Sequence, residues 1–383
     1  MASDALVIGG GAFGLNAALA LAQAGRRVTL VDPAGGAGDP GAASMGLVGA
    51  LGPHLPAPWT PLKALQFEAL VSLPLHAAAL EAATGLSPGW RATGRLQPLH
   101  DDAAWERAAS RAPGAAPIWA EALDAAPAPL RDGARAAFGW AEGPRAEIVD
   151  APPDPAWMAP PARGAWWDDL AALISPRRYC AALAAACRAE GVEFVAARAR
   201  AVDEGGADTD AGRLSAALTV VAAGAGSAKL LAGKLPLALS AEKGQAAFFN
   251  IAPPPGAMLI HQGGIWIVPH ADGIAVGSTA EKNWPAPGPD PLLDGVLEQA
   301  AALCPLLLGR EADERWAGLR PRAPGRGPLL GPVPGRGDAQ GGLWAATGGH
   351  KIGVALSHHV ARLLVRALGG APLPGGLAPA DRI

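Results

Sequence analysis

Residues 5–33 read ALVIGGGAFGLNAALALAQAGRRVTLVDP, and the fold class rests on this stretch. Secretory leaders and membrane anchors share its apolar composition. A leader begins with positive charge, whereas the early charge here is Asp4. Glycine destabilises a helix by about 1 kcal/mol per residue, so a helical membrane anchor disfavours it. Here Gly9, Gly10 and Gly11 are consecutive. We therefore expect neither a leader nor stable membrane insertion, and favour a binding site.

The same stretch predicts a dinucleotide-binding unit. A strand over residues 5–8, a helix over about 12–24 and a strand over 28–31 surround a G-x-G-x-x-G motif. Its first glycine allows a tight turn, its second lets the backbone approach a pyrophosphate, and its third lets helix and strand close. Asp32 ends the second strand, near the position expected of the acid that binds the ribose. The alternative is a glycine-rich turn without a ligand.

Composition narrows the class of protein. A chain of 383 residues is long enough for two domains. The formal net charge of −3 gives no electrostatic reason to expect a nucleic acid partner. Cys180, Cys187 and Cys304 contain no C-x-x-C motif, so we expect buried thiols and a cytoplasmic location. No histidine has metal-ligand spacing with carboxylates or thiols, and no metal is expected.

Periodicity predicts the other elements less sharply. A helix is expected from Pro61 with Thr60 as its N-cap, and another from Pro176 with Ser175 as its cap. A final helix is expected from about residue 354. Alternating apolar and polar residues predict antiparallel strands over the stretches 242–251 and 263–282. The stretch 86–164 has weak periodicity and predicts only mixed structure.

These elements predict a mixed α/β fold with two domains. A Rossmann-like nucleotide-binding domain is expected from three separated pieces of the chain, residues 1–60, 165–235 and 325–383. A substrate domain with an antiparallel sheet is expected from residues 61–164 and 236–324.

A series of motifs along most of the chain resembles the D-amino acid oxidase family of flavoproteins, and within it the bacterial glycine oxidase branch. The motifs are VIGGGAFG (7–14), SMGLVGALGPH (44–54), SPRRY (175–179), VVAAGAGS (220–227), EKGQ (242–245), IWIVPHADGIAVGST (265–279), WAGLRPRAPGRGPLLGP (316–332) and ATGGHKIGVAL (346–356). The resemblance implies FAD as the cofactor and oxidation of an amine carbon by hydride transfer to the flavin. It also implies FAD-binding residues, namely Gly9, Gly11, Ala12, Phe13, Gly14, Asp32, Ser44, Met45, Gly46, Leu47, Gly224, Gly348, Gly349, His350, Lys351, Ile352 and Gly353.

Three residues are candidates for the chemistry. Arg320, in GLRP, resembles the family's clamp for the substrate carboxylate, and a guanidinium fork matches two carboxylate oxygens. Lys351 stands where the glycine oxidase branch has an arginine, and with the final helix it would stabilise negative charge on the reduced flavin. The alternatives are a surface arginine and a solvated lysine. His54 ends a segment that resembles the flavin-side strand, and a structural histidine explains it equally well.

The chain also departs from the family pattern. Tyrosines commonly position the substrate there, but Tyr179 is the one tyrosine of this chain, and Trp266 stands where the glycine oxidase branch has a tyrosine. Trp266 can shape a pocket but offers only an N–H donor, and ordinary core packing is the alternative. The substrate therefore need not be glycine, and a bulkier, secondary or apolar amine is open.

The sequence thus predicts FAD-dependent oxidation of a small amino acid or amine, with hydrolysis of the imine product and release of hydrogen peroxide after reaction with oxygen. One alternative is a dehydrogenase of the same family that passes electrons to a quinone or protein acceptor. Another is a flavin-binding protein without turnover. An oligomer is compatible with the sequence.

Overall fold

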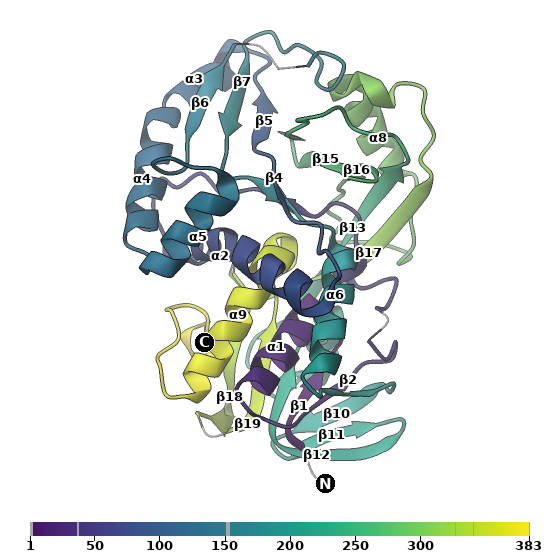
Figure 1. Ribbon diagram of the computed structural model, residues 1–383. Coiled ribbons are helices and arrows are strands. Elements are labelled where there is room, and N and C mark those ends of the chain that lie inside the picture. The colour runs from purple at the N-terminus through teal and green to yellow at the C-terminus, as the bar shows by residue number, and fades with distance from the viewer. Residues whose placement is uncertain (1–2, 37, 151–153, 326, 340, 383) are drawn as a thin grey trace.

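The computed structural model describes residues 3–36, 38–150, 154–325, 327–339 and 341–382. Figure 1 shows one sheet flanked by helices in the lower part of the view and a second sheet in the upper part. Helices and strands both contribute substantially, so the mixed α/β class is confirmed.

The first sheet has a parallel centre. β1 (Ser3–Ile8) lies between β2 (Val28–Val31) and β12 (Gly212–Val221), parallel to both. β9 (Glu193–Val195) extends the sheet beyond β2, and β19 (Gly341–Thr347) extends it beyond β12. β2 is buried along its whole length, as expected of a parallel strand that is covered on both faces. The sheet also contains β10 (Ala199–Asp203), β11 (Gly206–Thr209) and β18 (Leu329–Asp338).

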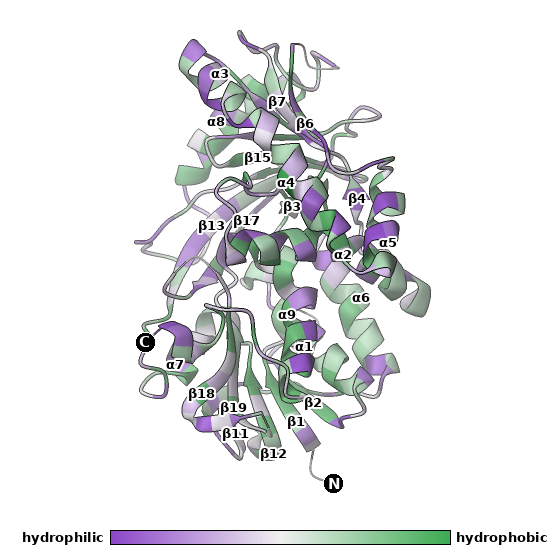
Figure 2. Cartoon of the chain, turned by 90° about the vertical axis from the view of Figure 1, so that its left-hand side faces the viewer, coloured by the Kyte–Doolittle hydropathy of each residue, from purple (hydrophilic) through white to green (hydrophobic). Residues whose placement is uncertain are grey.

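Helices α1 (Ala12–Gln23), α6 (Pro176–Ala189) and α9 (Gly353–Leu368) pack together against this sheet, as Figure 1 shows. α2 (Pro61–Thr84) lies against α6 and α9, and its apolar side chains join their core. Figure 2 shows hydrophobic residues along α1, α6 and α9 and along the parallel strands. The core therefore lies between the helices and the sheet and holds the β1–α1 turn in place.

The two predicted helix caps differ. Thr60 caps α2 as expected, because its hydroxyl oxygen accepts a hydrogen bond from the Lys63 amide at 3.3 Å. Ser175 occupies the N-cap position of α6, but among the described residues its side chain makes no capping hydrogen bond. α6 starts instead with Pro176, whose fixed φ suits the first helical turn.

The second sheet contains the predicted antiparallel strands. Its order is β17-β13-β16-β15-β14-β5-β7-β6, and each pair is antiparallel except β14 with β5. The strands are β17 (Glu314–Arg322), β13 (Ser240–Phe249), β16 (Gly273–Gly277), β15 (Ile265–His270), β14 (Leu259–Gln262), β5 (Arg95–Pro98), β7 (Ala165–Asp168) and β6 (Ala146–Val149). A turn at Ala271 and Asp272 joins β15 to β16, and Gly273 is the first residue of β16.

Short elements complete the chain. They are β3 (Ala50–Leu51), β4 (Arg91–Ala92) and β8 (Ala172–Leu173), which form a small third sheet, and the helices α3 (Asp102–Ala109), α4 (Ala112–Asp124), α5 (Ala128–Phe138), α7 (Ser227–Leu230) and α8 (Leu292–Leu303).

The expected domain division stays a prediction, and several elements cross it, among them β7 and α2. β7 falls in the piece 165–235, yet it pairs with β5 and β6 in the second sheet. α2 falls in the piece 61–164, yet it packs on helices of the first sheet. Both placements depend on contacts between segments far apart in the chain, which local periodicity does not report.

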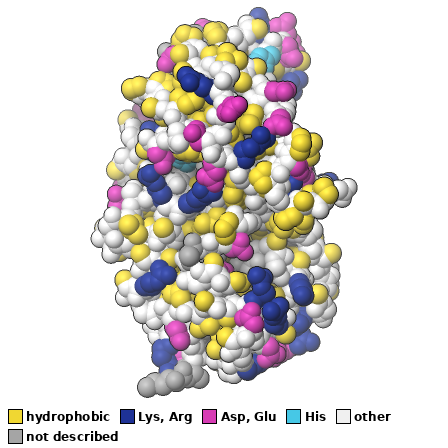
Figure 3. All heavy atoms as spheres, turned by 90° about the vertical axis from the view of Figure 1, so that its right-hand side faces the viewer, with side chains coloured by type: hydrophobic (Ala, Val, Ile, Leu, Met, Phe, Trp, Pro, Cys, Tyr) yellow, Lys and Arg dark blue, Asp and Glu magenta, His cyan; other side chains and the backbone are white. Residues whose placement is uncertain are grey.

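Within the described ranges, every helix is too short or too polar to cross a bilayer. Figure 3 shows Lys and Arg side chains interspersed with Asp and Glu on one face of the molecule, as expected from the near-balanced charge.

Candidate functional site

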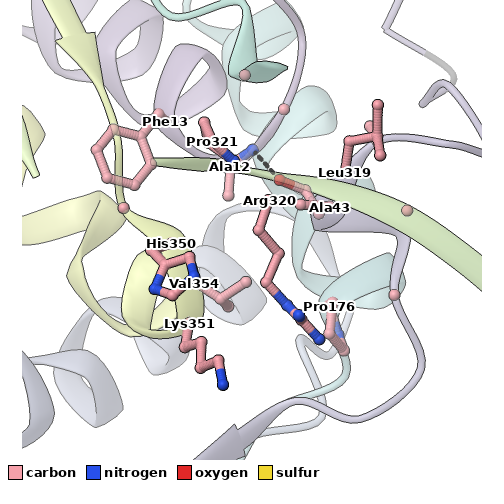
Figure 4. Close-up of a pocket in the computed structure, with 18 of the residues that line it drawn as sticks. Ala12, Phe13, Ala43, Pro176, Leu319, Arg320, Pro321, His350, Lys351 and Val354 are labelled. Carbon is pink, nitrogen blue, oxygen red and sulfur yellow. Dashed lines mark hydrogen bonds between the residues drawn. The ribbon is translucent and has the colours of Figure 1, made fainter. Parts of the chain in front are cut away.

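A cavity of about 980 Å³ collects residues from both sheets. Figure 4 shows part of its wall, with residues from the β1–α1 turn, β17 and the start of α9. Three candidates for the chemistry line this cavity, namely Arg320, Lys351 and His54. Trp266, the candidate for shaping the substrate pocket, lines it as well. Most residues predicted for FAD line it as well, namely Gly9, Gly11, Ala12, Phe13, Asp32, Ser44, Gly46, Leu47, Gly224, Gly348, Gly349, His350, Ile352 and Gly353. Gly14 and Met45 do not line it.

The glycines of the β1–α1 turn are required by close backbone contacts. Gly9 has φ of 111°, and a Cβ there would lie 2.5 Å from the Ala222 carbonyl oxygen. A Cβ on Gly14 would lie 1.8 Å from the Gly9 carbonyl oxygen. Gly14 therefore serves the packing of α1 on β1, as the third glycine of the motif should. Bare backbone is left facing the cavity at the positive end of α1.

Polar side chains hold this turn from two sides. Asp32 is largely buried at the end of β2, and its carboxylate accepts hydrogen bonds from the Gly10 amide at 2.7 Å and the Ala34 amide at 2.9 Å. The Ser44 hydroxyl accepts a hydrogen bond from the Ala12 amide at 2.9 Å. One large cavity is therefore lined by glycine backbone, by the N-terminus of α1 and by Asp32 at the end of β2. This arrangement fits a dinucleotide such as FAD.

A second helix N-terminus faces the same cavity. His350–Ile352 forms a 3₁₀ turn that leads into α9 at Gly353. Gly353, Val354 and Ala355, in the first turn of α9, line the cavity. Lys351 is exposed on this turn, and Figure 4 shows its side chain extending in the same general direction as that of Arg320. The helix dipole and the ammonium group therefore place positive charge at one end of the cavity.

Arg320 is held flat against the second sheet. Its guanidinium donates hydrogen bonds to the Ser278 hydroxyl at 2.8 Å and to the Thr279 carbonyl oxygen at 3.0 Å. A Cβ on Gly244 would lie 1.9 Å from Arg320 Nη2, so the side chain lies directly over this glycine of β13. The Arg320 side chain is only 12% exposed, and burial lowers its pKa below the ordinary arginine value. An anionic ligand in the cavity would meet a fixed guanidinium.

Glu242 joins Arg320 to the turn before α9. The strand register places Glu242 opposite Arg320, and its carboxylate lies 3.7 Å from Arg320 Nη1. His350 Nε2–H donates to the same carboxylate oxygen at 3.0 Å. Burial lowers the pKa of His350, although Glu242 opposes this effect. Burial disfavours the ionised form of Glu242, but the His350 hydrogen bond and the nearby Lys351 and Arg320 charges keep its pKa below the usual value.

Aromatic rings form another part of the wall. Trp266 stacks on His261 with ring centroids 3.9 Å apart, and both residues line the cavity. Burial, with a contribution from the Arg95 charge, lowers the pKa of His261 to about 4. The Arg95 guanidinium lies 5.9 Å from the Trp266 ring centre and pairs with the fully buried Asp168 at 2.6 Å. This part of the wall is therefore aromatic, and the Arg95 cation beside it has a counter-ion in Asp168.

Sequence reasoning placed His54 at the cavity but missed several neighbours. Glu242, His261, Arg95 and Asp168 were not expected to belong to the site. Alternation in EKGQ places Glu242 on the same strand face as Gly244, which is the one local signal available. In the described part of the chain, no group of His, Cys, Asp or Glu could hold a metal ion.

The comparisons with known proteins agree with this geometry. The family described as FAD dependent oxidoreductase (DAO) matches residues 4–367. A glycine oxidase of Pseudomonas aeruginosa is 34% identical over 46% of this chain and 50% of its own. The MnmC protein of Paracidovorax citrulli, named for tRNA 5-methylaminomethyl-2-thiouridine biosynthesis, is 33% identical over 97% of this chain and 58% of its own. The chain thus spans about half the length of the curated relatives it matches.

Solved structures share the whole fold. Glycine oxidase from Geobacillus kaustophilus has a TM-score of 0.79 at 22% identity and covers 100% of this chain and 98% of its own. Glycine oxidase from Bacillus cereus has a TM-score of 0.80 at 20% identity, with 98% and 97% covered. The family match extends over nearly the whole chain and the cavity fits a dinucleotide. The chain therefore belongs to the DAO family of FAD-dependent oxidoreductases, and its cofactor is FAD.

Proposed function

We propose that this protein oxidises the carbon–nitrogen bond of an amino acid or a related small amine. The observation that carries the proposal is Arg320, a buried guanidinium held by Ser278 and Thr279 at the wall of the FAD cavity. The glycine oxidase relatives support an amine as substrate. When bound, FAD would accept two electrons and so supply the oxidising equivalent.

The side chains of this chain would bind and orient the substrate. Arg320 uses two N–H groups for Ser278 and Thr279, and its fork geometry suits a substrate carboxylate. Glu242 balances part of its charge from behind. Loss of a hydride from the α-carbon of the neutral amine would give an iminium ion. Water would convert the iminium ion to a carbonyl compound, with release of ammonia or an amine and of one proton.

No side chain is required as the base. Burial lowers the pKa of His350, and its Nε2–H is already directed to Glu242. Lys351 and the N-terminus of α9 would stabilise the negative charge that FAD gains on reduction. The role of the chain is therefore to position the substrate and to supply the electrostatic field.

We propose oxygen as the electron acceptor, with hydrogen peroxide as the product. The runner-up functions are a dehydrogenase with a quinone or protein acceptor and a flavin protein without turnover.

We also propose a cytoplasmic location. The three cysteines are unpaired and buried, and burial raises the pKa of Cys180 to about 12, which suits inert structural thiols.

An anaerobic flavin-reduction screen tests this function. The holoprotein is mixed with D- and L-amino acids, glycine, sarcosine and cyclic imino acids, and loss of the flavin absorbance is recorded. Air is then admitted, and peroxide is measured. Reduction followed by fast reoxidation with peroxide supports the oxidase. Reduction with slow reoxidation supports the dehydrogenase, whereas no reduction by any compound supports a protein without turnover.

A further inference from the structure

Lys243 carries a buried ammonium group that lies outside the cavity wall. Its side chain is 0% exposed within β13. Successive residues of a strand point to opposite faces of the sheet. Arg320 lies over Gly244 on one face, so Lys243 and Gln245 point to the other face. Because an unpaired buried ammonium group is costly, the partners of Lys243 identify what it holds in place.

Two carboxylates and an amide surround this ammonium group. Lys243 Nζ donates a hydrogen bond to a carboxylate oxygen of Asp290 and lies 3.4 Å from Glu281 Oε2. Gln245 Nε2 donates hydrogen bonds to Glu281 Oε1 at 2.9 Å and to Asp290 Oδ1 at 2.7 Å. We call these four side chains the Lys243 cluster. It ties both ends of the stretch 282–289 to the same face of β13.

Thr279 connects the Lys243 cluster to Arg320 through the sheet. Its hydroxyl oxygen accepts a hydrogen bond from the Gln245 amide at 2.9 Å, and its hydroxyl group donates to Glu281 Oε1. Its carbonyl oxygen accepts a hydrogen bond from Arg320 Nη1 at 3.0 Å on the other side. The cluster therefore holds the side chain of Thr279, and Arg320 binds the backbone of the same residue.

A one-residue irregularity in the strand pairing places the two residues that hold Arg320. Ala246 lies opposite Gly277, whereas Lys243 forms a bridge with Glu281. Three steps along β13 therefore match four steps along the segment that follows β16, as in a β-bulge. Mutual amide–carbonyl hydrogen bonds of 2.9 Å between Lys243 and Glu281 close this bulge. Bulges re-aim groups beside active sites, and this one is closed by two members of the Lys243 cluster.

We propose that Lys243 is a positioning residue for the substrate carboxylate. It holds Glu281 and Asp290 against the back of β13, these carboxylates fix Thr279 through its hydroxyl group, and Thr279 holds Arg320 in the orientation that binds the carboxylate. Lys243 itself does not line the cavity, so it acts through Arg320. This inference rests on the proposed function, in which Arg320 binds a carboxylate.

The experiment measures carboxylate binding to the holoprotein. Acetate, propionate and benzoate lack an amine and are not substrates of the proposed reaction, and their binding is recorded as a change in flavin absorbance. The acid that binds the unmodified protein most tightly is the probe. Lys243→Met is expected to weaken probe binding at least about fivefold without loss of FAD. In anaerobic reduction by an amino acid, KM should rise by a similar factor while kcat stays within about twofold, because substrate binding and not the chemical step is affected.

Two changes at Thr279 test the link without removing a buried charge, and they decide the proposal even if Lys243→Met does not fold. Thr279→Val loses the hydroxyl group and is expected to weaken probe binding at least about threefold. Thr279→Ser keeps the hydroxyl group, so its affinity should stay within about twofold. The control is Leu307→Ala, a buried change in the core of the second sheet, which should lower the Tm but leave probe affinity within about twofold.

A double-mutant cycle separates positioning from a general loss of stability. In an Arg320→Ala background, the clamp that Lys243 and Thr279 position is gone. Lys243→Met and Thr279→Val should then lower the kcat/KM of anaerobic flavin reduction by less than about twofold, although each lowers it more when Arg320 is present. FAD content and Tm are recorded for every variant.

The outcomes separate the two proposals. Unchanged probe affinity in a folded Lys243→Met protein, or equal affinities of Thr279→Val and Thr279→Ser, overturns the positioning role but leaves amino acid oxidation in place. The same losses in the Arg320→Ala background, or an equal loss in Leu307→Ala, also overturn it. If no carboxylate binds the unmodified holoprotein and no amino acid reduces its flavin, the proposed function fails, and the positioning role fails with it.

Discussion

Arg320 is already oriented by the protein before a substrate arrives. Ser278 and Thr279 fix its guanidinium, and Glu242 lies 3.7 Å behind it. Arg320→Ala should weaken carboxylate binding by about 2–5 kcal/mol, because a buried charge partner is removed. FAD affinity should stay unchanged. Titration of flavin absorbance with a carboxylate measures the effect, and Arg322→Ala on the exposed part of the same strand is the control. A change within about threefold, under 1 kcal/mol, would contradict the clamp.

Lys351 should act on the cofactor rather than on substrate binding. It is exposed beside the N-terminus of α9, so its contribution is that of a partly screened charge. Lys351→Met should lower the flavin reduction potential by on the order of 10–30 mV, where 30 mV is about 1.4 kcal/mol for two electrons. Anaerobic redox titration measures this shift. Lys282→Met, also exposed but outside the cavity wall, should leave the potential unchanged; equal potentials in all three proteins would remove Lys351 from the site.

At the scale of elements, the packing of α1 on β1 determines whether the β1–α1 turn can bind FAD. A Cβ on Gly14 would meet the Gly9 carbonyl oxygen at 1.8 Å. Gly14→Ala should therefore destabilise the fold by at least about 1–3 kcal/mol, as overpacking does, and should release FAD. Thermal unfolding and FAD content measure both effects. Gly114→Ala on α4 is the matched control, because nothing lies within 4 Å of its Cβ, and it should be neutral or slightly stabilising.

The contact between α2 and α9 should make stability depend on pH. His76 and His358 stack there with centroids 5.1 Å apart, and burial lowers the pKa of His76 to about 4. Because the unfolded histidine binds a proton near pH 6.5 and the folded one does not, this stability is complete above pH 6.5 and is lost as the pH falls towards 4. Each such histidine should cost about 1.4 kcal/mol between pH 7.5 and 5.5.

Denaturant unfolding at both pH values checks this expectation. His76→Phe should reduce the loss of stability by the share of one histidine. His100→Gln should not, because His100 is exposed and lies outside this helix contact. The same pH sensitivity in His76→Phe and in the unmodified protein would exclude His76 as a contributor.

For the whole molecule, FAD binding should join segments that lie far apart in the sequence. The cavity wall includes residues from Ile8 to Ala355. The purified protein should be yellow, and denaturation should release FAD, because we expect a noncovalent site. A free FAD concentration of 100 times Kd should add about 2.7 kcal/mol to the free energy of unfolding. Thermal scans with FAD, and with riboflavin as control, measure the gain. A colourless protein that takes up no FAD, or flavin that stays on the precipitate, would contradict this prediction.

The sequence by itself determined the nucleotide-binding unit. Gly9, Gly11, Gly14 and Asp32 lie within one short stretch, so their spacing reports the turn, the helix and the strand end directly. The strands at residues 265–270 and 273–277 were also readable, because alternation and an Asp-Gly turn are local signals. The resemblance of the chain to a family could also be predicted from the order of its motifs, because motif order does not depend on side-chain geometry.

Only the tertiary structure decided what surrounds the predicted residues. Glu242 faces Arg320 because β13 pairs with β17, and His261 stacks on Trp266 because β14 pairs with β15. Arg95 meets Asp168 through the pairing of β5 with β7. Strand register is set by burial and hydrogen bonds between distant segments, and a shift of one residue would turn every side chain to the other face. Periodicity along one segment therefore predicts the strand, and the pairing of strands selects its partners.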